Sequence, residues 1–178
     1  PYVDLRASFN SFIPSSINEK LAEKLINIYL DNLLLNPEFH DKIEFDIAFT
    51  SWTPTFYEQA KKRLLSNGVS PLEVAELEDA LKKITLKAIK NFKTYKNIQN
   101  LSNRRNNILK IKNSKLKKSK SLLIDCKRNG TLGFAHAARL GFIAVSFLKS
   151  FVHKKIFTKD EIDKLMSSII GVSSKMQK

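Results

Sequence analysis

The segment 132–152 restricts the fold more than any other, because it is apolar on nearly every side of a helix. A helix of this kind is stable in water when other elements cover it, so the pattern predicts the central helix of a bundle. Its uninterrupted apolar stretch, 140–145, is far shorter than the ~20 residues that span a bilayer. His136 and Arg139 lie in its first half, where each would be costly in lipid. We therefore expect a water-soluble helical bundle and no membrane partner.

Helix start and stop signals recur along the rest of the chain. The capping-box pattern, a Ser or Thr followed three residues later by Glu, occurs at Ser16 with Glu19, at Ser70 with Glu73 and at Thr158 with Glu161. Thr53 followed by Pro54 predicts a further helix start, and Gly68 is typical of a helix end. Residues 101–123 predict one long basic helix, and 128–131 predict a turn. Together these signals indicate a mainly α protein.

Two shorter segments alternate apolar and polar residues with the period of a strand. In residues 2–10 the polar side is formed by Asp4, Arg6, Ser8 and Asn10. A second run, 43–49, has an apolar residue at every other position. We expect the two runs to pair as a small two-stranded β element in the N-terminal region. The predicted fold is mainly α, a helical bundle around a buried helix in the C-terminal half, in a single domain over 1–178.

Positive charge is concentrated in one segment. The chain carries 31 Lys and Arg against 17 Asp and Glu, a net charge of +14, and residues 80–124 contain no acidic residue. Such a stripe is typical of a surface that meets phosphate, nucleic acid or an acidic partner, and also of a solvated helix face. Its aromatic residues are Phe92 and Tyr95 alone, which makes nucleic acid the less favoured partner. The single cysteine, Cys126, excludes an internal disulfide and fits a cytoplasmic protein.

On the apolar helix the polar residues fall along one side, at His136, Arg139, Ser146 and Ser150. A guanidinium in a protein interior needs an anionic partner. Arg139 would therefore meet either a cavity that holds an anion or a carboxylate of the chain. The candidates for that carboxylate are Asp125, Glu44 and Asp46. His136 is either a hydrogen-bonded core residue or a catalytic one.

The polar side of the first predicted strand is a second candidate site. It combines Asp4 and Arg6 with two uncharged hydrogen-bonding side chains. An arginine binds a carboxylate with two parallel hydrogen bonds and an aspartate takes an ammonium group, so this side fits a zwitterion. It equally fits an ordinary solvated strand face. The histidines and Cys126 show no metal-ligand spacing, and there is no glycine-rich phosphate loop, so we expect no metal site.

Three longer motifs extend this interpretation. They are Pro1-Tyr-Val-Asp-Leu-Arg-Ala-Ser-Phe-Asn-Ser-Phe-Ile-Pro14, Glu38-Phe-His-Asp-Lys-Ile-Glu-Phe45 and Asp125-Cys-Lys-Arg-Asn-Gly-Thr-Leu-Gly-Phe-Ala-His-Ala-Ala-Arg139. With these motifs, and with 141–144 and 172–174, the chain resembles the middle region of bacterial proteins related to phosphoenolpyruvate synthase and pyruvate phosphate dikinase. Gly133 and Asn129 depart from the pattern, since they stand where a proline and an aromatic residue are expected.

The resemblance implies a place in a larger enzyme. In that family an ATP-grasp domain passes a phosphoryl group to a histidine on a swivelling domain, which delivers it to an acceptor, and ATP leaves as AMP and phosphate. This chain would be the acceptor-binding domain, a fragment that does not run the reaction alone. ATP and Mg²⁺ would belong to the full enzyme, and no cofactor to this domain. The Lys- and Asn-rich composition is similar to that of a member that phosphorylates L-glutamine for capsular phosphoramidate synthesis, which suggests an amino acid such as L-glutamine as the acceptor.

The resemblance also implies roles for single residues. His136 would hydrogen-bond the acceptor or assist proton removal, and Arg6 or Arg139 would hold a carboxylate or the incoming phosphoryl group. Asp4 or Glu44 would take an α-ammonium group. The expected substrate-binding residues are Asp4, Arg6, Ser8, Asn10, Glu44, Arg128, Thr131, Arg139 and Ser146. The alternative function is a basic docking or nucleic-acid-binding helical module that uses the 80–124 segment.

Overall fold

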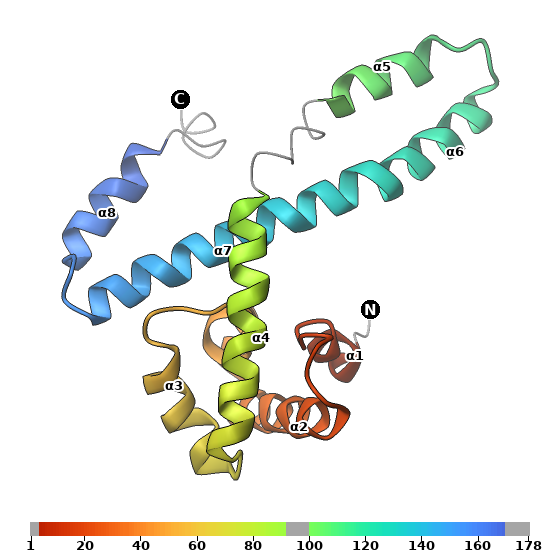
Figure 1. The fold of residues 1–178 in the computed structure, drawn as a ribbon. Coiled ribbons are helices and arrows are strands. Elements are labelled where there is room, and N and C mark those ends of the chain that lie inside the picture. The colour runs from red at the N-terminus through yellow and green to blue at the C-terminus, as the bar shows by residue number, and fades with distance from the viewer. Residues whose placement is uncertain (1–3, 92–99, 170–178) are drawn as a thin grey trace.

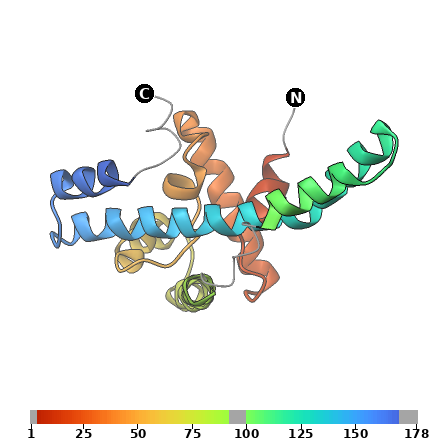
Figure 2. The ribbon, with the colours of Figure 1, turned by 90° about the horizontal axis from the view of Figure 1, so that it is seen from above.

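The computed structural model describes residues 4–91 and 100–169, and the regular structure of these residues is entirely helical (Figure 1). In chain order the elements are α1 (Leu5–Asn10), α2 (Glu19–Leu35), η1 (Pro37–Phe39), η2 (Ile43–Ile47), α3 (Phe56–Arg63), η3 (Leu65–Asn67), α4 (Pro71–Lys90), α5 (Leu101–Lys110), α6 (Lys115–Asp125), η5 (Cys126–Gly130), α7 (Thr131–His153) and α8 (Lys159–Ser168). The prediction of a mainly α protein is confirmed. Helices α1 to α4 form the core, and the long helix from α6 to α7 crosses it (Figure 2).

The first predicted strand is wrong, because the part of 2–10 that the structure describes is helix α1. Asp4 caps this helix, since its carboxylate accepts a hydrogen bond from the Ala7 N–H at 3.0 Å. The helix buries Phe9, whose ring centre lies 5.9 Å from that of Tyr29 on α2. A capping aspartate and one buried anchor on a neighbouring helix stabilise a helix that would be too short to persist alone.

The second predicted strand is also wrong, because Ile43–Ile47 forms a single π-helical turn, η2. Ile47 is buried in the core, and Phe45 contacts Phe142 of α7 with their ring centres 5.3 Å apart. The turn therefore lies between α2 on one side and α7 on the other. With the first segment helical, the described residues contain no strand with which this turn could pair, so the predicted two-stranded element is not supported.

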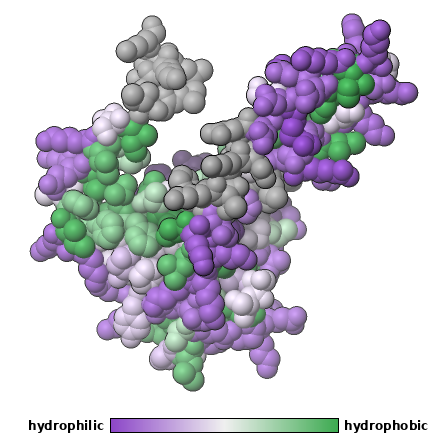
Figure 3. Space-filling model, turned by 45° about the horizontal axis from the view of Figure 1, so that its top comes forward, coloured by the Kyte–Doolittle hydropathy of each residue, from purple (hydrophilic) through white to green (hydrophobic). Residues whose placement is uncertain are grey.

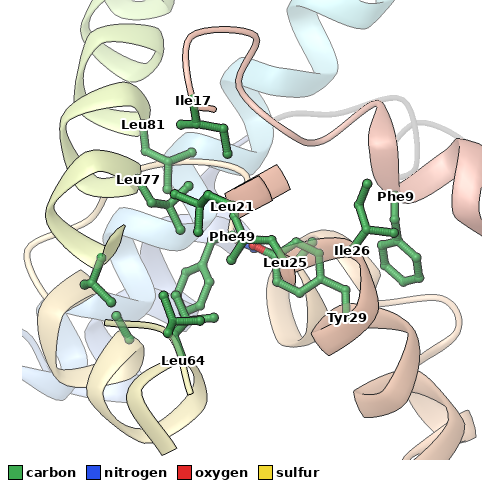
Figure 4. Packing of buried hydrophobic residues seen from close by; sticks show 14 of the residues in the cluster. Phe9, Ile17, Leu21, Leu25, Ile26, Tyr29, Phe49, Leu64, Leu77 and Leu81 are labelled. Carbon is green, nitrogen blue, oxygen red and sulfur yellow. The ribbon is translucent and has the colours of Figure 1, made fainter. Parts of the chain in front are cut away.

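The hydrophobic core fixes α4 against α2 (Figure 4). The buried residues that these two helices contribute include Leu21, Leu25, Leu77 and Leu81. Each such leucine contributes ~1.5–3 kcal/mol when its side chain leaves water. This packing sets the position of the C-terminal end of α4, which contributes to the candidate site.

Several helix ends follow the sequence signals. Capping boxes at Ser70 and Thr158 start α4 and α8, as predicted. Gly68 ends its helix with φ +79°, in the left-handed region that residues with a β-carbon rarely adopt. The start predicted at Thr53 is displaced, because α3 begins at Phe56.

The helix start predicted at Ser16 is wrong. Helix α2 begins at Glu19, and its cap is Asn18, whose side-chain oxygen accepts a hydrogen bond from the Leu21 N–H at 2.9 Å. The Asn18 backbone N–H also donates to a carboxylate oxygen of Glu76 on α4, at 2.9 Å. Asn is a favoured N-cap residue, and the contact between Asn18 and Glu76 of α4 favours this start over the one predicted from Ser16.

The basic segment folds as a hairpin of two helices, α5 and α6, where one long helix was predicted (Figure 1). The chain reverses between them, and Ser114 caps α6 by accepting a hydrogen bond from the Lys117 N–H. Arg104 on α5 joins the two helices through an ion pair with Asp125, with 2.7 Å between Nε and Oδ1. We call residues 101–125 the basic hairpin.

The turn predicted at 128–131 is not formed, because the helix continues from α6 through η5 into α7. The Thr131 hydroxyl donates a hydrogen bond to the Cys126 carbonyl at 3.3 Å, so this side chain bonds to the preceding turn of the same continuous helix. The result is one continuous helix, Lys115–His153, of 39 residues.

The prediction that α7 is the buried centre of the bundle is wrong. Among the described residues, α7 packs on the core through one side, with Ile143 buried and the Phe147 ring centre 6.1 Å from that of Trp52. On the other side Phe134 is 73% exposed, and Figure 3 shows hydrophobic side chains gathered over α7 and α8. The apolar pattern predicted the helix correctly. Its burial depends also on how much cover the other helices supply, and α1 to α4 cover one side.

The continuous helix is long and apolar enough, by length and composition, to cross a membrane. It contains an 18-residue window with a mean hydropathy of 1.4, of which 6% is buried. Helices of soluble proteins can meet the same criterion, and α7 packs on the core and carries Arg139. Our expectation of no membrane partner therefore stays a prediction.

Candidate functional site

A groove of about 630 Å³ opens where α7 crosses the C-terminal end of α4, and we call it the α4–α7 groove. Its third wall is the segment between α1 and α2. The lining includes Ser11, Pro14, Lys87, Asn91, His136 and Arg139.

Two predicted residues lie together in this groove. His136 and Arg139 are three residues apart on α7, and this spacing brings them to the same side of the helix. His136 is half-buried and has a partner within the protein, whereas Arg139 is exposed. Lys87 on α4 adds a second cation to the lining. The groove therefore combines two positive charges with an imidazole, a set that suits a small anion.

The internal ion pair considered for Arg139 is not formed within the described part of the chain. Asp125, one of the candidate partners, pairs with Arg104, and the hydrogen bond from that guanidinium lowers the pKa of the Asp125 carboxyl. The premise of a buried guanidinium is wrong as well, since Arg139 is exposed. Its positive charge is therefore directed to the groove and to solvent.

Three of the four predicted N-terminal residues line a different hollow, of about 470 Å³, between α1 and α2. Its lining includes Asp4, Arg6, Asn10, Glu19 and Glu23. Arg6 donates to the side-chain oxygen of Asn27 at 2.9 Å, and the Ser8 hydroxyl donates to the Asp4 carbonyl at 2.9 Å. Asp4, Arg6 and Asn10 thus stay together at this hollow, whereas Ser8 does not line it. Arg6 and Arg139 thus do not form one site.

The other predicted residues are separated further. Glu44 and Ser146 line a hollow of about 50 Å³, which holds a water molecule more readily than an amino acid. Arg128 and Thr131 lie on the continuous helix before the groove and line none of these three hollows. The expected site residues are divided: His136 and Arg139 line the α4–α7 groove, whereas Asp4, Arg6 and Asn10 line the hollow between α1 and α2.

Sequence reasoning missed Lys87, Asn91 and the segment 11–15. Lys87 belongs to the basic stripe, in which no pattern distinguishes one lysine from another. Its place in the groove depends on where α4 crosses α7. The segment 11–15 overlaps the end of the first motif, and that overlap is a signal that could have identified it.

Within residues 4–91 and 100–169, no group of three or more His, Cys, Asp or Glu side chains is placed to hold a metal ion. Comparison of the chain with protein families, with curated proteins and with solved structures finds no match. The functional assignment therefore depends on the groove and on the motifs that meet there.

Proposed function

We propose that this chain is the acceptor-binding domain of an ATP-dependent, AMP-forming phosphotransferase of the family related to phosphoenolpyruvate synthase. One observation carries the proposal: two motifs far apart in the sequence contribute to the same groove. Ser11 and Pro14 come from the first motif, and His136 and Arg139 come from the third. Binding residues must meet at an opening to solvent, whereas residues that serve packing alone need not.

The composition of the groove supports a small acceptor that carries a carboxylate. Its volume of about 630 Å³ lies within the range of ~300–1,000 Å³ that is usual for small-molecule sites. Phosphoryl transfer depends mainly on placement and on neutralising charge, and Arg139 and Lys87 supply two cations. His136 would hydrogen-bond the acceptor or take up its proton, because an imidazole exchanges protons in the physiological pH range. With L-glutamine as the acceptor, the amide nitrogen would receive the phosphoryl group.

The domain would act with other domains of the same polypeptide. An ATP-grasp domain and a swivelling phosphohistidine domain would supply the phosphoryl group, and the full enzyme would use ATP and Mg²⁺ in the cytoplasm. The exposed apolar side of α7 and α8 supports this arrangement, because a soluble protein rarely leaves a large apolar patch uncovered. The exposed residues of that side include Phe134, Ile156, Leu165 and Met166.

Isothermal titration calorimetry with L-glutamine, L-glutamate and inorganic phosphate tests the proposal. We expect one of them to bind, and Arg139→Ala to weaken that binding about tenfold or more, since a hydrogen bond to a charged group contributes ~1.5–3 kcal/mol. Arg128→Ala is the matched control, because it removes the same charge from the same continuous helix outside the groove. Equal weakening by the two substitutions would contradict the proposal, as would the absence of binding to the full enzyme.

A second candidate function is docking to an acidic protein surface through the basic hairpin. The hairpin extends away from the core as a hydrophilic arm (Figure 3), and its one acidic residue, Asp125, is paired with Arg104. It contains no aromatic residue on which a base could stack, which disfavours single-stranded nucleic acid. It also exposes aliphatic side chains that a protein surface would cover, namely Ile111, Leu116 and Leu123.

Charge reversal of exposed hairpin lysines tests this second candidate. The reversed residues are Lys115, Lys117 and Lys120, and the control reverses Lys20, Lys61 and Lys155. Binding of a polyglutamate peptide and of single-stranded RNA is followed by fluorescence anisotropy. Loss of peptide binding in the hairpin variant alone supports docking. Wild-type binding of RNA that falls steeply with salt would favour a nucleic-acid module instead.

A further inference from the structure

A separate hollow of about 320 Å³ lies between α2 and α3, and we call it the α2–α3 hollow. Helix α2 contributes Asp31, and α3 contributes Lys62 and Arg63. Tyr29, which is buried, lies at its inner end, and burial raises the pKa of the Tyr29 phenol to about 12. None of these residues lines the α4–α7 groove.

Arg63 holds its guanidinium against the core without a carboxylate at ion-pair distance in the described part of the chain. Its Cζ lies 4.3 Å from the centre of the Phe49 ring, and its Nη2 donates to the Ile47 carbonyl. Burial lowers the pKa of Arg63, and electrostatic interactions with Tyr29 and then with Asp46 offset part of that effect. A guanidinium withdrawn from water normally has an anionic partner, and the described residues supply no carboxylate within ion-pair distance.

The remaining donors of this guanidinium are the ones that a ligand in the hollow could use. A guanidinium has five N–H donors. Among the described residues, the Ile47 carbonyl accepts a hydrogen bond from Arg63. Every buried side-chain nitrogen and oxygen among these residues has a hydrogen-bond partner. The nitrogens of Arg63 that have no acceptor among these residues are therefore not fully buried, and the hollow that Arg63 lines is the α2–α3 hollow.

We propose that the α2–α3 hollow binds a small oxyanion through Arg63 and Lys62. The planar guanidinium matches the paired oxygens of a carboxylate or a phosphate, and Lys62 adds a second positive charge. Asp31 adds one negative charge to the same lining, which opposes a dianion more than a monoanion and leaves these three charged residues with a net charge of +1. We therefore expect both acetate and phosphate to bind, and we expect Asp31 to limit phosphate binding more than acetate binding. This site goes beyond the proposed function and shares no residue with the groove, so either proposal can fail alone.

The side-chain Nε–Hε resonance of Arg63 reports on this site directly. We would titrate the ¹⁵N-labelled chain with sodium acetate and with sodium phosphate at constant ionic strength. A saturable shift of the Arg63 resonance is expected with acetate and with phosphate. Lys62→Gln should raise the acetate Kd about tenfold through the loss of a charge-assisted hydrogen bond. Because Lys62 is exposed, this variant is expected to keep its fold.

Lys61→Gln is the matched control, since it removes the same charge from an exposed neighbour that does not line the hollow. It should change the acetate Kd by less than about twofold, as expected for a surface charge. Asp31→Asn should strengthen phosphate binding more than acetate binding. A shift of the Arg63 resonance that does not saturate, or equal effects of Lys61→Gln and Lys62→Gln, would overturn the site. Equal effects of Asp31→Asn on phosphate and acetate binding would overturn the proposed role of Asp31.

Discussion

Phe147→Ala is expected to loosen α7 from the core, whereas Phe134→Ala on the same helix is expected to change little. Phe147 is half-buried, and its ring meets that of Trp52 edge-on, with an interplanar angle of 66°. Truncation of a fully buried phenylalanine costs ~3–5 kcal/mol. Half of that burial, with the edge-on aromatic contact included, leads us to expect a loss of ~2–3 kcal/mol in the free energy of unfolding. Phe134 is 73% exposed, so its truncation should cost no more than ~0.5 kcal/mol.

The assay uses Trp52, which is the single tryptophan of the chain. Its indole N–H donates to Glu78 at 3.0 Å, and Lys82 Nζ lies 5.0 Å from the ring centre. Both contacts come from α4 and should persist in the variant. Urea unfolding followed by circular dichroism gives the free energy of unfolding, and native-state fluorescence gives the environment of Trp52. We expect red-shifted emission for Phe147→Ala and wild-type emission for Phe134→Ala.

Similar losses of free energy in the two variants would refute this reasoning, because α7 would then be covered on both sides or on neither. A larger loss for Phe134→Ala would mean that α7 lies on the core with the opposite side. Either result would also mean that α7 does not line the α4–α7 groove in the way described above.

Two further predictions concern α4. Hydrogen bonds from Lys24, and then from Ser70, lower the pKa of Glu73 to about 2. The contribution of Glu73 to stability should therefore be complete above its ordinary pKa of 4.5 and be lost as the pH falls from 4.5 towards 2. Glu73→Gln should flatten the pH dependence of Tm in that window, and an unchanged profile would argue against this coupling. Leu77→Ala, at a residue 1% exposed, should lower the free energy of unfolding by ~3 kcal/mol, whereas Leu72→Ala, at a residue 84% exposed, should change it by less than ~0.5 kcal/mol. Equal losses in urea unfolding would contradict the position of the core.

Local signals in the sequence predicted local structure. Ser70 and Thr158 start helices because a capping box joins groups only three residues apart. Gly68 ends a helix because glycine, unlike the other amino acids, lacks the β-carbon that opposes the left-handed conformation. These features are complete within a few residues, so they do not depend on how the chain packs.

Predictions that depend on how distant segments of the chain pack together failed. The alternating pattern of 5–10 is compatible with a strand, but the cap at Asp4 and the contact of Phe9 with α2 favour a helix. The alternating pattern of 43–47 then has no strand to pair with. The apolar pattern of α7 predicts a helix and says nothing about how much of it the other helices cover.

The same distinction between local and packing-dependent features explains which predicted site residues lie together. His136 and Arg139 stay together because the helix period alone places them on one side. Arg6 and Glu44 lie elsewhere because their positions depend on α1 and η2, which were predicted as strands. Lys87 enters the groove through the crossing of α4 and α7, which no local pattern encodes.

A map of amide chemical-shift changes in the ¹⁵N-labelled chain on addition of L-glutamine tests most directly whether the α4–α7 groove receives the acceptor. We expect the changes to concentrate at 11–15, at Lys87 and at 136–139, and to saturate with one common Kd. Changes centred on the hollow around Arg6, with none at 136–139, would contradict the central claim.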